Sequence, residues 1–324
     1  MRRFLIVMMV FITALTPVMA GGSSESSDGA YPSKMLTMIV PNAAGGGADI
    51  STRLLCKYLE GELGQNIVVQ NITGGSLTIG LTSLSEADPD GYTLGYFAST
   101  NSNDNKLFQG VVYNADSFTP IAMYASDPHI IVVGKDSGIE SMDQLLEKLE
   151  ANPGNVTFGI GGAWSSHDFL RQKFEDATGT EFLRMVFQTG TAAVTAVAGG
   201  NCDVGVPFVS EAVAQIEAGN IVPIAISSEE RSPLFPDVPT LKECGIDVVH
   251  EMWRSINGPA GLPEDVIKTV SDAIGRASAN SDYLAEAEAS GMNVSYMPYE
   301  EFKDFYWTNH EEYSAMIDAM NSGN

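Results

Sequence analysis

The sequence has 324 residues, more than one hydrophobic core usually organises, and it therefore predicts about two domains. Hydrophobic residues make up 44% of the chain and charged residues 18%, a composition that excludes a disordered protein. The 17 basic and 41 acidic residues give a formal net charge of -24. Because a surface of that sign repels phosphate backbones, we expect no nucleic-acid partner.

The first twenty residues are typical of a secretory signal peptide. Two arginines precede an apolar stretch over residues 4–19, and a small-residue cleavage pattern ends at Ala20. The stretch is shorter than the roughly 20 residues that span a membrane, so we favour cleavage near Ala20 over a permanent anchor. Residues 21–30 would form a flexible leader, and the mature protein would be free in solution after secretion.

Short apolar stretches then alternate with segments of helical periodicity, which is typical of α/β sheets covered by helices. The expected strands cover residues 36–40, 67–70, 93–98, 121–125, 156–160, 182–187, 204–206, 222–226 and 252–257. The expected helices run from Asp49 to about Glu60, after Gly75, after a capping box at Ser141, from about Ser166, and from Pro263. Two similar units, each opening with a strand, glycines and a helix, predict two lobes across a cleft.

The first glycine loop, residues 41–49, offers a binding site for an anion. Its three glycines let a ligand approach the backbone, and the next helix begins with unpaired amides. It matches neither a dinucleotide fingerprint nor a phosphate loop, and a simple tight turn is the alternative. Asp49 and Arg53 share a helix face, so Asp49 either forms a cap and a surface ion pair or accepts a hydrogen bond from a ligand.

The second glycine loop, residues 159–167, has the same design as the first. Gly161 and Gly162 precede a helix that Ser165 or Ser166 would cap. Trp164 would lie at the rim of the cleft and offer a stacking face, although ordinary core packing explains a tryptophan equally well.

The sequence has few signals of an enzyme. Cys56, Cys202 and Cys244 are odd in number and widely spaced, so neither a disulfide framework nor a zinc site follows. The four histidines lack metal-ligand spacing, and we expect no metal, no cofactor and no catalytic residue. A secreted serine hydrolase stays open as the enzyme alternative, because the members of a catalytic triad can lie far apart in sequence.

Several short motifs follow one another in order along the chain. They are Val40-Pro41 before Gly45-Gly46, Leu63-Gly64-Gln65, Pro89-Asp90-Gly91-Tyr92, Phe118-Thr119-Pro120, Pro236-Asp237-Val238-Pro239-Thr240 and Pro259-Ala260-Gly261-Leu262-Pro263. From residue 31 onward, this ordered set resembles the extracytoplasmic solute receptors of tripartite tricarboxylate transporters, also called Bug-type receptors.

The resemblance implies a two-lobed α/β periplasmic binding protein of type II, in which each lobe is a mixed, mostly parallel sheet flanked by helices. Lobe one would comprise residues 31–124 and 252–324, and lobe two residues 125–251, with the strands around 121–125 and 252–257 as the hinge. Such a receptor closes around a small carboxylate as a monomer and delivers it to the membrane subunits of the transporter. A ligand sensor for a two-component system is the alternative role.

In this family, main-chain amides of the two glycine loops and trapped waters hold the ligand carboxylate. The candidate ligand-binding residues here are Asn42, Ala43, Gly46, Gly47, Asp49, Ser99, Thr100, Gly161, Gly162, Ala163, Trp164, Ser165, Ser166 and Thr189. Asn42 replaces a usual aromatic residue, and Ala163 and Trp164 stand where small residues are usual. We expect Asn42 and Trp164 to reshape the cleft for a different or smaller ligand.

Overall fold

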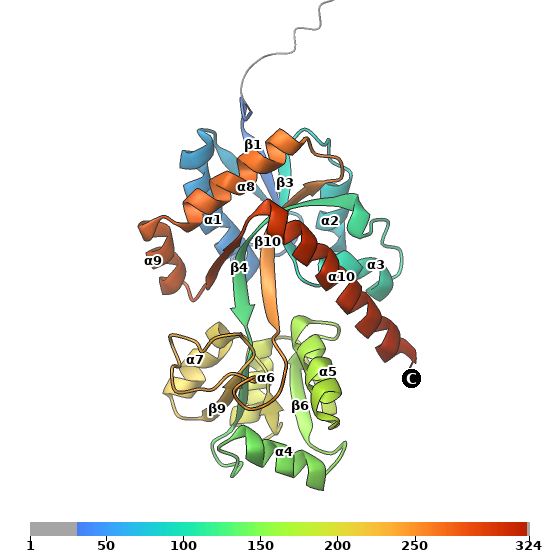
Figure 1. The fold of residues 1–324 in the computed structure, drawn as a ribbon, viewed down its shortest axis with the longest axis vertical. Coiled ribbons are helices and arrows are strands. Elements are labelled where there is room, and N and C mark those ends of the chain that lie inside the picture. Colours follow the sequence, from blue (N-terminus) through green and yellow to red (C-terminus); the bar gives the residue numbers. More distant parts are fainter. Residues whose placement is uncertain (1–30, 323–324) are drawn as a thin grey trace, which may run out of the picture. The chain divides into compact units, whose positions relative to one another are not determined.

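The computed structural model describes residues 31–322, whose fold is shown in Figure 1. The expected signal peptide, residues 1–20, and the expected leader, residues 21–30, lie outside the described residues. Within the described part, no helix combines the length and the apolar composition of a membrane span. The contacts of the chain from Tyr31 onward group into one compact unit, and the limits of the two lobes stay a prediction.

Two sheets organise the described residues. The strands of the first sheet are β1 (Leu36–Val40), β2 (Ile67–Asn71), β3 (Thr93–Ala98), β4 (Phe118–Pro128), β10 (Glu251–Pro259) and β11 (Val294–Met297), and they lie in the order β11-β4-β10-β3-β1-β2. The strands of the second are β5 (Ile130–Gly134), β6 (Thr157–Gly161), β7 (Leu183–Phe187), β8 (Val204–Gly205) and β9 (Ile221–Ile226), in the order β7-β6-β8-β5-β9. The two-lobed α/β fold class is thereby confirmed.

The sheets are mixed, as expected, but they contain fewer parallel pairs than expected. Among the described strands, two of the five pairings in the first sheet and two of the four in the second are parallel. The physical reason is the passage of the chain between the sheets. β4 leaves the first sheet and β10 returns beside it in the opposite direction, as the green and orange arrows of Figure 1 show.

Helices cover both faces of each sheet. Their bounds are Gly47–Leu63 (α1), Thr78–Ser85 (α2), Asp104–Leu107 (α3), Met142–Ala151 (α4), Ser166–Thr178 (α5), Gly190–Ala198 (α6), Val209–Glu217 (α7), Glu264–Ser278 (α8), Ser281–Ala289 (α9) and Tyr299–Ser322 (α10). Helices α1 and α8 share a core with one face of the first sheet, and α2 and α10 share a core with the other. Helices α4 and α5 pack on one face of the second sheet, and α6 and α7 on the other.

The clearest helix expected from the sequence, α8, has the predicted buried stripe. Pro263 precedes its first turn, and the apolar positions on one face are all buried. The exposed side carries charged residues such as Lys268. Local periodicity was enough to predict α8 because one continuous face contacts one sheet.

Truncating a side chain in this stripe tests the core of the first sheet. Ile274 is fully buried in the cluster that α8 shares with α1, so Ile274→Ala should lower the free energy of unfolding by about 2–5 kcal/mol. Urea denaturation followed by circular dichroism measures the loss. Lys268→Ala on the exposed face is the control and should change stability by less than about 0.5 kcal/mol. Equal effects of the two changes would contradict the proposed packing.

Candidate functional site

The first glycine loop joins the carboxyl end of β1 to the start of α1. Gly45 adopts φ +79°, a left-handed conformation that glycine tolerates well, and Gly46 is the extended residue that precedes the helix. The loop surface from Ala43 to Gly47 is exposed. Among the described residues, no acceptor is found for the backbone N–H groups of Gly47, Ala48 and Asp49, so they can donate to a ligand.

Asp49 fixes the shape of this loop. Its buried carboxylate accepts hydrogen bonds from Gly45 N (2.8 Å), Arg53 Nε (2.8 Å) and Asn71 Nδ2 (2.9 Å). Burial alone would raise the pKa of the Asp49 carboxyl, but these hydrogen bonds outweigh it and hold the pKa below its usual value. Asp49 therefore acts as a structural anchor of the loop, with the ion pair to Arg53 that the sequence suggested.

The second glycine loop repeats this arrangement at the start of α5. The backbone N–H of Trp164 donates to Asp168 Oδ2 (3.1 Å), four residues on, as Gly45 donates to Asp49. Trp164 adopts φ +60°, and Ser165 is the extended residue before the helix. Asp168 is fully buried and also forms ion pairs with Arg171 Nε (3.1 Å) and Arg184. Sequence reasoning missed Asp168, although its spacing from Trp164 equals the spacing from Gly45 to Asp49.

Gly161 and Gly162 of the second glycine loop lie close to the segment that contains Thr189. A Cβ on Gly161 would lie 2.3 Å from Gly190 N, so only glycine fits against this segment. The backbone N–H of Gly162 donates to Phe187 O (2.9 Å). Thr189 caps α6 through a hydrogen bond from Ala192 N (3.1 Å) to its hydroxyl. The structure thus brings Gly161, Gly162 and Thr189 together.

The remaining sequence candidates differ in their exposure. Trp164 is half-buried and packs against Phe169, Tyr313 and Ile317, which supports the packing explanation for this tryptophan. Ser99 is fully buried after β3, and Thr100 is half-buried.

Asn42 is a further candidate from the sequence. Its backbone carbonyl accepts a hydrogen bond from Asn71 Nδ2 (3.0 Å). Its buried side-chain oxygen has no partner among the described residues. Among the hydrogen bonds and ion pairs of residues 31–322, none joins the first glycine loop to the second.

Sequence reasoning missed a buried ion pair beside the first loop. Arg254 Nη1, from β10, donates to Gly47 O (3.0 Å) and Ser51 Oγ (2.9 Å), and the guanidinium pairs with Asp127 at the end of β4. Burial would lower the pKa of Arg254, but the neighbouring charge of Asp127 raises it above its ordinary value. The sequence did contain a signal for this pair, because Arg254 is a charged residue inside the strand that was expected to cross between the lobes.

Three of the four histidines lie together where the chain passes between the sheets. The ring centroid of His129 is 5.0 Å from that of His167 and 5.2 Å from that of His250. Burial, with the other rings, holds the pKa values of His129 and His250 well below the ordinary value. Within the described residues, no cluster of three or more His, Cys, Asp or Glu side chains is arranged to hold a metal ion. The three cysteines are free thiols.

One histidine of this cluster contacts a serine. His250 Nε2 lies 2.9 Å from Ser166 Oγ and 2.9 Å from the carbonyl oxygen of Ser166. Because a carbonyl oxygen only accepts, Nε2 carries the hydrogen when it bonds this carbonyl. In that tautomer Nε2 is not the base that a hydrolase would need to activate Ser166.

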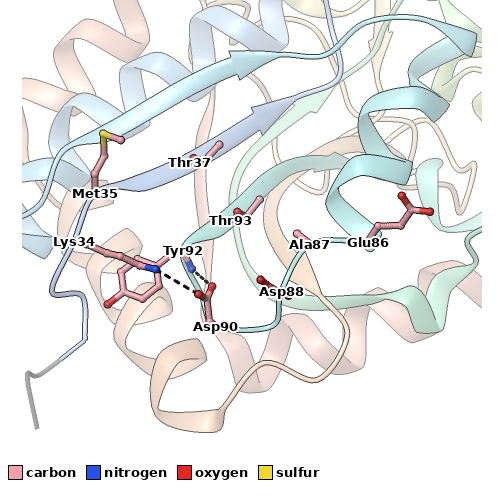
Figure 2. Close-up of a pocket in the computed structure, with 9 residues that line it drawn as sticks. All are labelled: Lys34, Met35, Thr37, Glu86, Ala87, Asp88, Asp90, Tyr92 and Thr93. Carbon is pink, nitrogen blue, oxygen red and sulfur yellow. Dashed lines mark hydrogen bonds and ion pairs between the residues drawn. The ribbon is translucent and has the colours of Figure 1, made fainter. Parts of the chain in front are cut away.

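Two surface hollows lie away from the glycine loops. Figure 2 shows one of about 520 Å³ at the amino ends of β1 and β3, where Asp90 accepts a hydrogen bond from Tyr92 N (2.9 Å) and pairs with Lys34 (3.7 Å). The other, of about 600 Å³, is lined by strand residues of the first sheet, which include Asp127 and Glu251, and by residues of α7, α9 and the segment that follows β9. Because ligands of open α/β sheets bind outside the carboxyl ends of the strands, the hollow in Figure 2 lies at the wrong edge.

Two mixed sheets joined by crossing strands, each with a glycine loop at the start of a helix, define a solute-binding protein of the periplasmic binding class. The chain belongs to the family described as the tripartite tricarboxylate transporter family receptor, whose family model, TctC, matches residues 51–322. It is therefore a solute-binding receptor, and the resemblance noted in the sequence is confirmed.

Individual relatives agree with this assignment. The protein BugT of Bordetella pertussis is 28% identical over 295 residues, which are 90% of this chain and 89% of BugT. A TctC solute binding protein from Polaromonas has a TM-score of 0.80 and 27% identity, covering 89% of this chain and 99% of that one. MatC from Rhodopseudomonas palustris, with bound malate, shares the fold at a TM-score of 0.69 and 24% identity, covering 89% of this chain and 100% of MatC.

Removing the charge of Asp49 tests its role as the anchor of the first loop. Asp49→Asn should lower the free energy of unfolding at pH 7 by about 1–3 kcal/mol. The reason is that the Gly45 N–H and the Arg53 Nε–H lose a charged acceptor. Since the folded pKa of Asp49 is depressed, its stabilisation is present above the unfolded value of about 3.9 and is lost as the pH falls through the folded pKa.

Denaturant titrations at pH 7 and pH 3 check this expectation, and the difference between wild type and Asp49→Asn should shrink at the lower pH. Glu62→Gln breaks the exposed pair between Glu62 and Arg276 and is the control, with a change below about 1 kcal/mol. A difference that is equal at both pH values would show that the charge of Asp49 does not stabilise the fold.

Proposed function

We propose that the protein is a periplasmic receptor that binds a small carboxylate between its two glycine loops and delivers it to the membrane subunits of a tripartite transporter. The observation that carries the proposal is the pair of loops, each anchored by a buried aspartate and followed by a helix whose first amides have no acceptor among the described residues. These amides belong to Gly47, Ala48 and Asp49 in α1 and to Ser166 and His167 in α5, where the N–H of Asp168 already donates to Ser165 O (2.9 Å). Such amides, at the positive end of a helix dipole, favour a negatively charged ligand. The candidate ligand-binding residues are those expected from the sequence.

The electrostatics of the protein favour short-range recognition over long-range steering. The net charge of -24 opposes the approach of an anion, and screening limits that repulsion to roughly 8 Å at physiological salt. The anchoring carboxylates of Asp49 and Asp168 are each paired with arginines, so they do not cancel the attraction of the amides beside them. A ligand carboxylate would then be held mainly by backbone N–H groups and waters.

The contacts of Ser166 and His250 support a receptor over a hydrolase. Both residues are buried, and a contact to the carbonyl of Ser166 occupies the imidazole nitrogen that faces the Ser166 hydroxyl. We therefore propose that the protein has no catalytic function.

Loss of solute uptake on deletion of the gene would separate transport from sensing.

Thermal denaturation with simple carboxylates tests the class of ligand. Malate and adipate, which are bound in two proteins of the same fold, are the first probes, and citrate and acetate extend the range of charge. A probe at a hundred times its Kd should add about 2.7 kcal/mol of stability and raise the Tm by several degrees. Adipamide, the uncharged control, should have no effect. Equal shifts with adipate and adipamide would contradict carboxylate recognition.

A proline substitution tests the backbone amides of the first loop directly. Gly47 is the first residue of α1, where proline is tolerated, and Gly46 already has the extended conformation (φ -80°, ψ 166°) that proline requires before it. Gly47→Pro removes one free N–H donor, and a hydrogen bond to a charged group is worth about 1.5–3 kcal/mol. The affinity for the best carboxylate probe should therefore fall about tenfold to a hundredfold.

The matched control is Gly47→Ala, which keeps the N–H group. Its Cβ would lie 3.8 Å from the guanidinium of Arg254, an ordinary contact, so the affinity should be unchanged. Isothermal titration calorimetry of both variants gives the comparison. If Gly47→Pro folds and binds the probe as tightly as Gly47→Ala, the ligand does not use this amide.

A further inference from the structure

The pairing of the two crossing strands is irregular where they contact the start of α1. In the register of β10 on β4, Arg254 lies opposite Ala125 and Ser255 lies opposite Met123, so Tyr124 has no opposite residue. Such a β-bulge redirects side chains and is common beside functional sites. Here it accompanies contacts from both strands to α1, because the side chains of Arg254 and Tyr124 each form hydrogen bonds there.

Arg254 joins the start of α1 to both crossing strands. Its Nη1 donates to Gly47 O (3.0 Å) and to Ser51 Oγ (2.9 Å). Its Nη2 pairs with Asp127 at the end of β4. A Cβ on Gly47 would lie 3.8 Å from both Nη1 and Nη2, so the guanidinium lies directly against this glycine. Because the guanidinium is rigid and planar, these three partners fix its position.

The charge of this group does not explain its place. A cation at the start of a helix opposes the helix dipole, and the burial of an unpaired charge is costly. Asp127 offsets the charge of Arg254, so the pair as a whole is neutral. The pair therefore supplies the loop with a fixed hydrogen-bond donor for the carbonyl of Gly47.

A bond to the Gly47 carbonyl also determines where the next amide points. The peptide bond that joins Gly47 to Ala48 is planar and trans, so its N–H points away from its C=O. The Ala48 N–H is one of the amides without an acceptor among the described residues. A donor on the carbonyl also polarises the peptide group, which strengthens its N–H as a donor. Arg254 thus acts, through one peptide bond, on an amide of the first glycine loop.

We propose that Arg254 is a positioning residue of this loop, which directs the Ala48 N–H toward the ligand and keeps α1 in register with the crossing strands. The proposal rests on the proposed function, because it assigns the Ala48 amide to a carboxylate ligand. Without the guanidinium, the Gly47 carbonyl loses a charged donor and the first turn of α1 can tilt. A ligand would then have to order this turn, which weakens the affinity.

The variant Arg254→Lys separates the donor geometry from the charge. It keeps a positive charge beside Asp127 but replaces the planar guanidinium by a single ammonium group. Tyr124→Phe is the matched control, because it also removes contacts to the start of α1. The buried hydroxyl that it deletes lies 3.2 Å from Ser51 Oγ and 3.2 Å from Thr52 Oγ1. The bond from Arg254 to the carbonyl stays intact in this control.

Hydrogen exchange of the ligand-free proteins is the first measurement. The backbone N–H groups of Gly45, Gly46 and Ile50 are hydrogen-bonded within the loop and the first turn of α1, so their exchange reports on how firmly this segment is held. We expect these amides to exchange about tenfold faster in Arg254→Lys and less than about twofold faster in Tyr124→Phe.

The second measurement is the affinity for malate and adipate. It should fall about tenfold in Arg254→Lys and less than about twofold in Tyr124→Phe, because only the first variant loses a charged hydrogen bond to the loop. If wild type binds neither probe but the exchange result is as expected, the proposed function fails and the role of Arg254 in fixing the loop stands. If the two variants behave alike in exchange, that role fails, whatever the affinity. Faster exchange in Arg254→Lys with wild-type affinity would show that the Ala48 amide is not directed at the ligand.

A neutral pair keeps the test decisive if Arg254→Lys does not fold. Arg254→Met combined with Asp127→Asn removes both charges, so neither is left buried without a partner. This double variant also lacks the donor to the Gly47 carbonyl, and we expect the same faster exchange and a loss of affinity of about tenfold. Exchange and affinity equal to those of wild type would overturn the role of Arg254.

Discussion

A carboxylate in the first turn of a helix determines the shape of each glycine loop. Asp49 and Asp168 accept a hydrogen bond from the backbone N–H of the residue four positions earlier, which bends the loop, and at least the first two amides of each helix have no acceptor among the described residues. A carboxylate at this position would by itself repel an anion. The arginines paired with it, Arg53 in one loop and Arg171 and Arg184 in the other, neutralise the charge while keeping the bend.

The parts of the fold that depend on local patterns could be predicted from the sequence. Strands β1 and β3 have the expected bounds, and α1, expected to run to about Glu60, ends at Leu63 with Gly64 as its C-cap. The two glycine loops were also evident, because glycines, a cap and a helix follow one another within ten residues. Asp168 could have been found by comparing the two loops position by position.

Features that depend on tertiary contacts could not be predicted. Only His129 separates β4 from β5, so the apolar pattern did not predict β5 as a separate strand, and the crossing near it was expected from the family resemblance alone. The pair between Arg254 and Asp127 depends on the antiparallel register of β10 on β4, in which Met252 lies opposite Asp127. Helix α10 packs its two halves on different partners, so it lacks the single apolar stripe by which α8 was recognised.

The clustered histidines make the junction between the sheets sensitive to acid. His129 and His250 are kept uncharged by burial and by neighbouring rings, whereas an exposed imidazole in the unfolded chain gains a proton near pH 6.5. Protons therefore bind the unfolded chain in preference, and stability declines as the medium becomes more acidic than that value. A compartment open to the surroundings would expose this weak point to every fall in external pH.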